Sequence, residues 1–457
     1  MKQTGAAAGR WSSRVAFHLA AVGAAVGLGS IWRFPYLAGA RGGSAFVFAF
    51  ILACLAVATP LLVAELLIGR SSRRSPPEAA GELAARQGGA RGWNVIGVMG
   101  AAAGFLIISY YTVIAGWVLA YTWKCASGEL SGLSRVAVVE QFHAFLSSPL
   151  RVGAWHLAFV TLTAVISARG VNRGIELANK IRAPGLLVLL LILVAYALAT
   201  GDVRRGLAFA FSLDLGKLSA DVLLAAVGQA FYATGVGMGI MLAYGAYVPS
   251  GLSLVRSALV ISGSIVAVSL LATLMIFPLV YRYGLNPAQG PDLVFNVLPT
   301  AFAEMAGGRL VGTLFFLLLV LAALTPSIAG VEPVVAWLEQ RRGLTRTTAV
   351  FVAFTGVWLL GIGSVLSFNT WAQWHPLGWL ARFRGMTLFD ALDFISSDVL
   401  LPVGALVTSI FIGWRLEPDV GATGLPEESA AVRGLWRFLL RYVCPVAITA
   451  VLVAAIA

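Results

Sequence analysis

Charged side chains are scarce in this chain. Only 11% of its 457 residues are Asp, Glu, Lys or Arg, and 59% are hydrophobic, whereas soluble domains carry roughly 25% charged residues. This scarcity excludes a protein whose whole surface faces water. The mean hydropathy is +0.88, and apolar runs of about 20 residues, the length that crosses a bilayer, recur along the whole chain. We therefore expect an all-α integral membrane protein in contact with the lipid bilayer.

Cysteine and histidine are also rare, with three and four residues respectively. Cys54, Cys125 and Cys444 lie far apart, so we expect neither a disulfide framework nor a CxxC metal site. The net charge of +12 could suggest a nucleic-acid partner, but we expect none because no basic stripe with interleaved aromatic residues is present. The first apolar run is too long for a cleavable signal, and we expect it to remain as a helix.

The apolar runs predict about 11 transmembrane spans. Their approximate limits are 14–38, 44–69, 94–123, 153–168, 181–199, 222–248, 255–281, 309–338, 347–367, 388–414 and 435–457. With a cytoplasmic N-terminus, Lys and Arg favour the cytoplasmic loops by roughly two to one, and we assign Arg169, Lys180 and Arg182 to that side. We expect a multi-pass protein of a bacterial cell inner membrane. The polar stretch 282–308, with a short helix near 299–306, is predicted to be a lid or re-entrant segment on the outer face.

Two of the predicted spans carry clusters of glycine. The first contains GAAVGLGS over residues 23–30, and the sixth contains GVGMG over residues 235–239. Glycine costs about 1 kcal/mol relative to alanine in a helix interior, although it also allows close helix packing. The clusters occupy corresponding positions, each first in a set of five spans. Paired interruptions of this kind indicate an inverted-repeat transporter with its site near the membrane midplane.

Particular residues then resemble a known family. Trp11 and Arg14, followed by GAAVGLGSIWRFP over residues 23–35, resemble the first helix of the neurotransmitter:sodium symporter (NSS) family, the carriers of the LeuT fold. The likeness continues in order through 42–46, Pro60-Leu61, Glu65, 69–70, Tyr110-Tyr111, 228–231, 323–325, Glu332-Pro333 and 392–394.

The resemblance implies a LeuT fold: a 5+5 inverted repeat with discontinuous helices 1 and 6, of the short bacterial type with 11 helices. We expect one transporter domain over 1–457. Its repeats would cover about 14–199 and 222–414, with an extra helix at 435–457.

The same resemblance implies a substrate pocket. Its lining would come from helices 1, 3, 6 and 8, at Ala25, Gly29, Ile107, Tyr111, Phe231, Tyr232, Gly235, Met238, Pro326 and Gly330. In amino-acid carriers of this family the tyrosine that matches Tyr111 binds the substrate carboxylate, and monoamine carriers have an aspartate where this chain has Gly27. The pocket is therefore expected to favour a solute that brings its own carboxylate. Gly235 and Gly330 are expected to leave room for a bulky apolar or aromatic side chain.

The sodium sites of the family are only partly matched. The first site implies side-chain ligands at Ser30, Ala233 and Ile265, of which only Ser30 has a side-chain oxygen; Ser264 could serve if the register differs by one residue. We predict that this site is lost. The second site implies carbonyls of Gly23, Val26 and Ala322 with the hydroxyl of Thr325, and Pro326 replaces a second hydroxyl. A weakened sodium site remains possible there, and we expect no other cofactor.

Gate residues are also implied by the resemblance. Arg33 and Asp393 match the outer pair, beneath which Tyr111 and Tyr232 would form an aromatic lid. Trp11 and Arg14 match the inner gate, where Arg10 and Glu339 could replace the usual charged partners. Glu65 is expected to hold helix ends together rather than carry protons. Gly174 and Pro184 resemble the glycine-x9-proline motif that lets helix 5 unwind.

These residues predict a secondary active transporter that moves a small carboxylate-bearing, hydrophobic or aromatic amino-acid-like solute by alternating access. Two alternatives remain: a sodium-independent carrier or exchanger of a non-amino-acid organic solute, and a binding-only sensor. An enzyme is not expected, because neither paired carboxylates nor a nucleophile with its base falls in the pocket. We expect a monomer or weak oligomer. Sodium, protons and uncoupled exchange all remain open as coupling modes.

Overall fold

The structure is a computed structural model that describes residues 11, 13–170, 177–249, 251–288, 292–416 and 424–456. These residues form helices and no strand. Nine continuous helical stretches within the described part are long and apolar enough to cross a membrane: Ser44–Ser72, Arg91–Ser127, Pro149–Ala168, Arg182–Thr200, Leu254–Arg282, Gly308–Arg342, Arg346–Ser367, Leu388–Arg415 and Ala430–Ile456.

Two further spans are interrupted. The pair Arg14–Ala25 (α1) and Gly29–Ala40, which contains α2 (Phe34–Ala40), bends by 51°. The other pair is α11 (Ala220–Thr234) and α12 (Ile240–Gly245), each of which is short by itself. With the nine continuous stretches they account for the 11 predicted spans, and the discontinuity of spans 1 and 6 is confirmed. The predicted limits of the two repeats stay a prediction.

The continuous spans are divided into the following helices. They are α3 (Ser44–Ala53), α4 (Thr59–Ser72), α6 (Val95–Ser127), α8 (Pro149–Ala168), α9 (Leu177–Thr200), α13 (Leu254–Arg282), α15 (Gly308–Arg342), α16 (Arg346–Ser367), α17 (Leu388–Asp393), α18 (Leu401–Ile410), α20 (Ala430–Phe438) and α21 (Cys444–Ile456). Short π-helical turns join several of them, as at Cys54–Ala58 between α3 and α4. Shorter helices cover the ends of the bundle: α5 (Pro76–Ala85), α7 (Arg135–Leu146), α10 (Val203–Phe211) and α14 (Leu298–Glu304).

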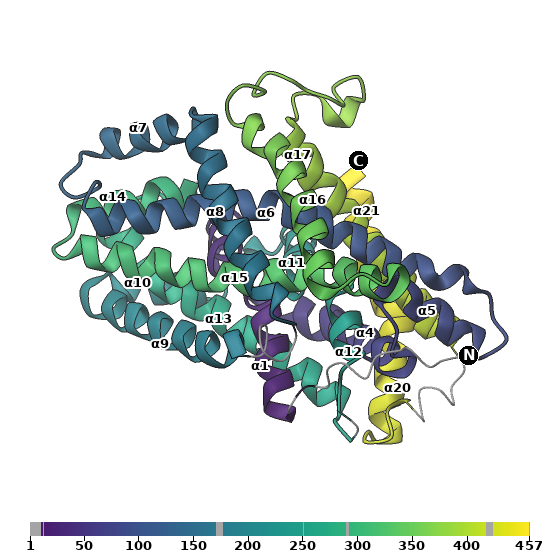
Figure 1. Cartoon of the computed structure of the whole chain (residues 1–457). Helices are drawn as coiled ribbons and strands as arrows, with labels where there is room; N and C mark the ends of the chain where they lie inside the picture. Colours follow the sequence, from purple (N-terminus) through teal and green to yellow (C-terminus); the bar gives the residue numbers. More distant parts are fainter. Residues whose placement is uncertain are drawn as a thin grey trace.

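Local sequence signals explain where these helices begin and end. Ser13 and Thr345 accept backbone N–H bonds at the starts of α1 and α16, as N-cap residues commonly do. Gly128 and Gly343 adopt left-handed backbone at the ends of α6 and α15, where glycine has no steric penalty. The long helices α6 and α15 then pack against each other at the centre of the bundle (Figure 1). α1 and α12, one half of each interrupted span, contact α15.

The segment predicted as a lid contains a helix, as expected, but it is packed rather than solvated. Residues 293–298 and 301 are almost fully buried. Phe295 contacts the rings of Trp117, Tyr121 and Phe142, with centroids 5.4–5.6 Å apart. Aromatic pairs at such distances add stabilisation to simple apolar burial. The segment therefore packs against α6 and α7 in this conformation.

Candidate functional site

The interruption of span 1 lies between Ala25 and Gly29. α1 ends at Ala25, and Val26 leaves the helical region with φ −79° and ψ 100°. The last carbonyl groups of a helix have no donor within it, so those of Gly23, Ala24 and Ala25 are directed toward the break. No glycine of this break has a positive φ. The predicted carbonyl ligands Gly23 and Val26 therefore lie at the end of a half-helix, where partial negative charge collects.

The interruption of span 6 has a different backbone. Gly235, Gly237 and Gly239 have φ values of 67°, 86° and 71°, a region that only glycine visits without cost. The carboxylate of Glu65 in α4 accepts the N–H of Gly237 at 2.7 Å, and Glu65 is only 1% exposed. Glu65 thus anchors the unwound segment, in agreement with the prediction that it holds helix ends.

Tyr111 lies directly at the break in span 1. Its hydroxyl accepts the N–H of Leu28 at 3.3 Å, and the side chain is 4% exposed. A Cβ on Gly27 would lie 3.2 Å from this hydroxyl and 2.6 Å from Cγ of Pro326. The structure therefore brings together Tyr111, Gly27 and Pro326, which come from three different spans. The Pro326 ring takes the space that a side chain at position 27 would need.

Gly29 and Gly330 are close-contact positions. A Cβ on Gly29 would lie 3.1 Å from the ring of Tyr232, and one on Gly330 would lie 2.5 Å from Cγ1 of Ile108. In this conformation Ile108 lies where a side chain at position 330 would be, and the role of Gly330 in leaving room for a solute stays a prediction. The backbone of α15 approaches α6 closely here because both Gly330 and Gly104 lack side chains.

The remaining predicted pocket residues lie in the interior of the bundle. Ala25, Ile107, Phe231 and Met238 are between 1% and 7% exposed. At Gly235 the nearest atoms to an added Cβ, from Ile240 and Met238, would lie at 3.4 and 3.5 Å, which is ordinary van der Waals contact. Their role in binding a solute stays a prediction.

The outer-gate residues use other partners in this conformation. Arg33 lies over the ring of Tyr232, 4.4 Å from its centroid, and Nη1 donates to Oε1 of Gln229 at 3.4 Å. Asp393 accepts from the hydroxyls of Tyr110 at 2.8 Å and Ser397 at 3.0 Å. Among the ion pairs that the described residues form, none joins Arg33 to Asp393.

Gln229 was missed as a site residue although it lies in the quoted stretch 228–231. Its amide nitrogen donates to the carbonyl of Gly29 at 2.7 Å, while its amide oxygen accepts from Arg33. It therefore links the outer half of span 1 to span 6. Its position one helical turn before Tyr232 and Ala233 was the available signal.

The two predicted inner-gate residues differ in burial. Trp11 is buried, its Nε1 donates to the carbonyl of Tyr244 at 3.4 Å, and the two rings are 5.3 Å apart. Arg14 is exposed. Glu339 pairs with Arg346 at 3.3 Å. Arg10, the proposed partner of Glu339, and Gly174 of the glycine-x9-proline motif lie outside the described residues.

At the first ion site the side-chain oxygens are few. The hydroxyl of Ser30 is fully buried and has no hydrogen-bond partner among the described residues. Ile265 is also fully buried, whereas the half-exposed Ser264 donates to the carbonyl of Val260 at 2.7 Å. The one-residue register shift that could have brought Ser264 into the site is therefore not supported by the geometry. Ser30 remains as the one side-chain oxygen of the predicted set.

At the second ion site the backbone carries most of the candidate oxygens. Thr325 is 2% exposed in α15, and α15 contacts both α1 and α9. Pro326 has no N–H, and a proline removes the bond that its position would give to the carbonyl four residues earlier, here that of Ala322. The predicted carbonyl ligand Ala322 is thus released from helical bonding by the same residue that replaces the second hydroxyl.

Arg182 was assigned to the cytoplasmic end of the predicted span 181–199, and it lies inside α9 and is only 7% exposed. Its guanidinium donates to the carbonyl of Leu321 in α15, beside Ala322. Charge counting could not reveal this, because a long arginine side chain can reach inward from a helix end.

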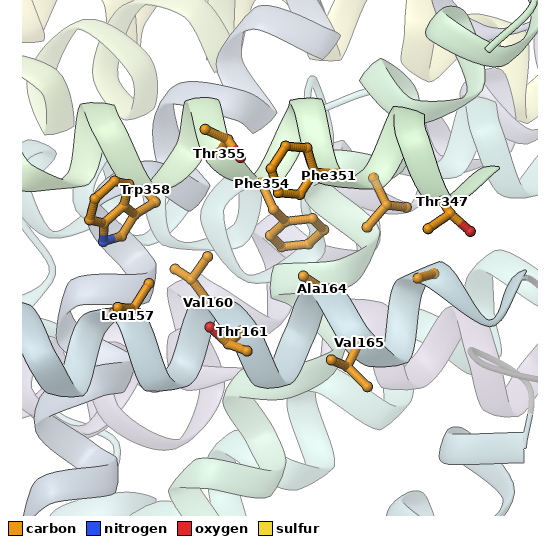
Figure 2. A pocket seen from close by; sticks show the side chains of 12 residues that line it. Leu157, Val160, Thr161, Ala164, Val165, Thr347, Phe351, Phe354, Thr355 and Trp358 are labelled. Atoms are coloured by element: carbon orange, nitrogen blue, oxygen red, sulfur yellow. The ribbon is translucent and has the colours of Figure 1, made fainter. Parts of the chain in front are cut away.

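A separate groove lies on the outside of the bundle. It runs between α8 and α16, has a volume of about 350 Å³, and is lined mainly by apolar side chains such as Val160, Phe354 and Trp358 (Figure 2). Leu157 and Phe351 at its margins are 47% and 70% exposed. Exposed apolar side chains are normal on spans that face lipid. Contact with lipid therefore accounts for the apolar lining of this groove, and we do not assign the groove to the central site.

Comparison with known proteins gives a consistent result. The sequence model described as "Sodium:neurotransmitter symporter family" matches residues 8–135 and 140–457. An uncharacterized sodium-dependent transporter of Bacillus subtilis, YhdH, is 36% identical over 447 residues and 96% of each chain. An uncharacterized sodium-dependent transporter of Haemophilus influenzae is 30% identical over 97% of each chain. The crystal structure of MhsT in complex with L-phenylalanine aligns with a TM-score of 0.88 and 38% identity, over 98% of this chain and 99% of that one.

Proposed function

The chain belongs to the sodium:neurotransmitter symporter family, and we propose that it moves a small carboxylate-bearing solute across the membrane by alternating access. The resemblance seen in the sequence is confirmed for family and fold. It is a family of multi-pass transporters rather than enzymes. Location in a bacterial inner membrane, with the N-terminus in the cytoplasm, is part of the proposal and is supported by the loop charges.

One observation carries the proposal. The hydroxyl of Tyr111 meets the N–H of Leu28 at the break in span 1. The Tyr111 hydroxyl accepts this N–H and keeps its own proton, which can be donated to a carboxylate, and the start of a half-helix favours negative charge. Gly27 adds no carboxylate of its own beside them. The arrangement therefore suits the acid group of an amino-acid-like solute.

The apolar surroundings support a hydrophobic or aromatic side chain. Met238 is a pliable wall, and it lies in van der Waals reach of Gly235, 3.5 Å from where a Cβ would be. The relative MhsT has been crystallised with L-phenylalanine. We propose the same class of solute for this chain.

Coupling is proposed to differ from the family pattern. Ser30 is the only side-chain oxygen of the expected first site, and repaying the dehydration of a cation requires several oxygens. We propose that this site does not bind sodium. Sodium at the second site would depend on backbone carbonyls and Thr325 alone. Two relatives are named sodium-dependent transporters. Measuring the sodium dependence of this protein therefore tests the proposal directly.

The test is a thermal-stability screen of the purified full-length protein. L-phenylalanine and L-leucine should raise the unfolding midpoint, whereas phenethylamine, which lacks the carboxylate, should not. Tyr111→Phe should weaken the effect of L-phenylalanine by about 10-fold in apparent affinity, since a hydrogen bond to a charged group contributes about 1.5–3 kcal/mol. Equal stabilisation by phenethylamine would contradict the proposed role of the carboxylate.

A second candidate is a sodium-independent carrier or exchanger of another organic acid. The missing oxygens at the first site favour it, because an ion there would otherwise lie near the substrate carboxylate. Aromatic carboxylates without an amino group, such as phenylacetate, would then stabilise the protein better than L-phenylalanine. Counterflow of labelled solute into proteoliposomes, without any ion gradient, separates either carrier from a binding-only sensor.

A further inference from the structure

The interior of the membrane bundle contains a buried cation that the proposed function does not yet use. Arg182 is 7% exposed and lies within the span Arg182–Thr200. A charged side chain inside a membrane span is costly and points to a function with defined partners. Arginine is also always protonated in proteins, so its charge is permanent. The question is which groups this charge serves.

The contacts of Arg182 lead to the centre of the molecule. Its guanidinium donates to the carbonyl of Leu321, the residue before Ala322. It is also close enough to Tyr111 and Tyr244 to interact electrostatically with both side chains. Tyr111 marks the break in span 1, and α9, which carries Arg182, contacts α1 and α15. The helix that carries Arg182 thus contacts both helices that supply the candidate second ion site, and the guanidinium is bonded to one of them.

The candidate second ion site, next to Leu321, offers several carbonyl oxygens. α1 ends at Ala25, and the carbonyls of its last turn bear the negative end of the helix dipole. Pro326 frees the carbonyl of Ala322, because proline cannot donate to it. A guanidinium has five N–H donors and no acceptor, so such a cluster of oxygens matches it. A bound cation could interact favourably with the same partial negative charges.

We propose that the guanidinium of Arg182 permanently supplies the positive charge of the second cation site, so that this site works without sodium. The inference rests on the proposed function for the location of that site. It deepens the proposal on coupling, because a fixed charge cannot be carried across the membrane with the solute. Transport would then proceed by exchange or down the gradient of the solute.

The experiment measures the cation dependence of the protein without any solute. Unfolding midpoints of the full-length protein are compared in NaCl and in choline chloride at equal ionic strength. The unchanged protein should have the same midpoint in both salts. Arg182→Gln keeps N–H donors but removes the charge, so its midpoint should fall in choline chloride and rise by at least about 2 °C in NaCl. Arg182→Gln combined with Pro326→Ser, which restores a hydroxyl, should increase the sodium response.

Two variants control for general damage. Arg182→Lys keeps the positive charge and should remain insensitive to sodium. Lys180→Ala removes a charge from an exposed neighbour on the same helix and should behave as the unchanged protein does. If Arg182→Gln does not fold, the comparison of the unchanged protein with Arg182→Lys in the two salts still decides the matter. Stabilisation of the unchanged protein by sodium would overturn the inference.

A solute arm separates this inference from the proposed function. L-phenylalanine is titrated into the unchanged protein in both salts. Equal stabilisation in NaCl and choline chloride supports both proposals, and stabilisation only in NaCl overturns the inference while leaving the proposed function intact. No response to L-phenylalanine or to other carboxylates, with sodium-independent midpoints, overturns the proposed function and still supports the fixed charge.

Discussion

The two interrupted spans look alike in sequence but are built differently. In span 6, Gly235, Gly237 and Gly239 all adopt left-handed backbone. In span 1, Gly23, Gly27 and Gly29 all keep negative φ values, and the neighbours Pro326 and Tyr232 lie against Gly27 and Gly29. In span 6 glycine allows a left-handed backbone, whereas in span 1 it allows neighbouring side chains to pack closely against the chain. The same residue type therefore predicts different consequences of substitution at the two places.

The supports of the two breaks differ as well. Span 6 is anchored by a buried carboxylate, since Glu65 accepts the N–H of Gly237. Span 1 is contacted by neutral groups, the hydroxyl of Tyr111 and the amide of Gln229. Neutral groups leave the positive end of a half-helix available to an anion. This difference agrees with the proposed binding of a solute carboxylate at span 1, whereas Glu65 holds the backbone of span 6.

The largest effect is expected from Gly237→Ala. The new Cβ would combine a φ of 86° with an approach of 2.6 Å to the carbonyl oxygen of Leu401. Left-handed backbone costs about 1–2 kcal/mol and overpacking about 1–3 kcal/mol, so we expect a loss of about 3 kcal/mol in thermal unfolding. Gly239→Ala is the matched control, with φ 71° but no atom nearer than 3.5 Å, and should lose about half as much. Equal losses would contradict the added clash.

Glu65→Ala should have the next largest effect. It leaves the N–H of Gly237 buried without its acceptor, which costs about 1–3 kcal/mol. Glu65→Gln keeps a carbonyl oxygen that can accept this N–H and should be nearly as stable as the unchanged protein. Thermal unfolding measures both. A large loss with glutamine would mean that the negative charge, not the hydrogen bond, holds the break.

Gly27→Ala should destabilise by about 1 kcal/mol, the low end for overpacking. The half-exposed ring of Pro326 can give way, and φ at Gly27 is not positive. Combining it with Pro326→Ala should recover part of the loss, because the ring atom 2.6 Å from the new Cβ is removed. The double-mutant cycle should give a coupling of at least about 0.5 kcal/mol. Additive losses would show that the two residues act independently.

The smallest effect is expected from Gly228→Ala in α11. An added Cβ would meet no atom within 4 Å and φ is not positive, so stability should rise by no more than about 1 kcal/mol, the cost of glycine relative to alanine in a helix interior. Uptake into proteoliposomes is measured on the same variant. Normal stability with slow uptake would show that glycine here serves movement of the helix, a third role beside the two compared above.

Several features could be predicted from the sequence because their causes are local. The length and spacing of apolar runs indicated the spans, since about 20 residues are needed to cross the bilayer. The glycine clusters located both breaks, and the motifs along the chain identified the family, as the match over residues 8–135 and 140–457 confirms. The expected place of Tyr111 beside span 1 agrees with its contact to Leu28.

Other features could not be predicted because they depend on where distant segments meet. Arg33 contacts Gln229 and Tyr232 rather than forming a direct ion pair with Asp393, and Ile108 fills the space beside Gly330. Ser264 and Ile265 differ by one position, which is within the error of any alignment but turns a side chain by about 100° around a helix. The structure has Ile265 fully buried and Ser264 half-exposed.

The sequence by itself determined the membrane class, the two breaks and the family, because hydrophobic length, glycine content and motif order are properties of the linear chain. Only the tertiary structure decided what the two similar breaks are for and where Arg182 directs its charge. Whether an added atom meets a proline ring or a carbonyl depends on packing between helices hundreds of residues apart, as at Gly27 and Pro326. An arginine at the cytoplasmic end of a predicted span likewise becomes an internal cation only when α9 lies against α15.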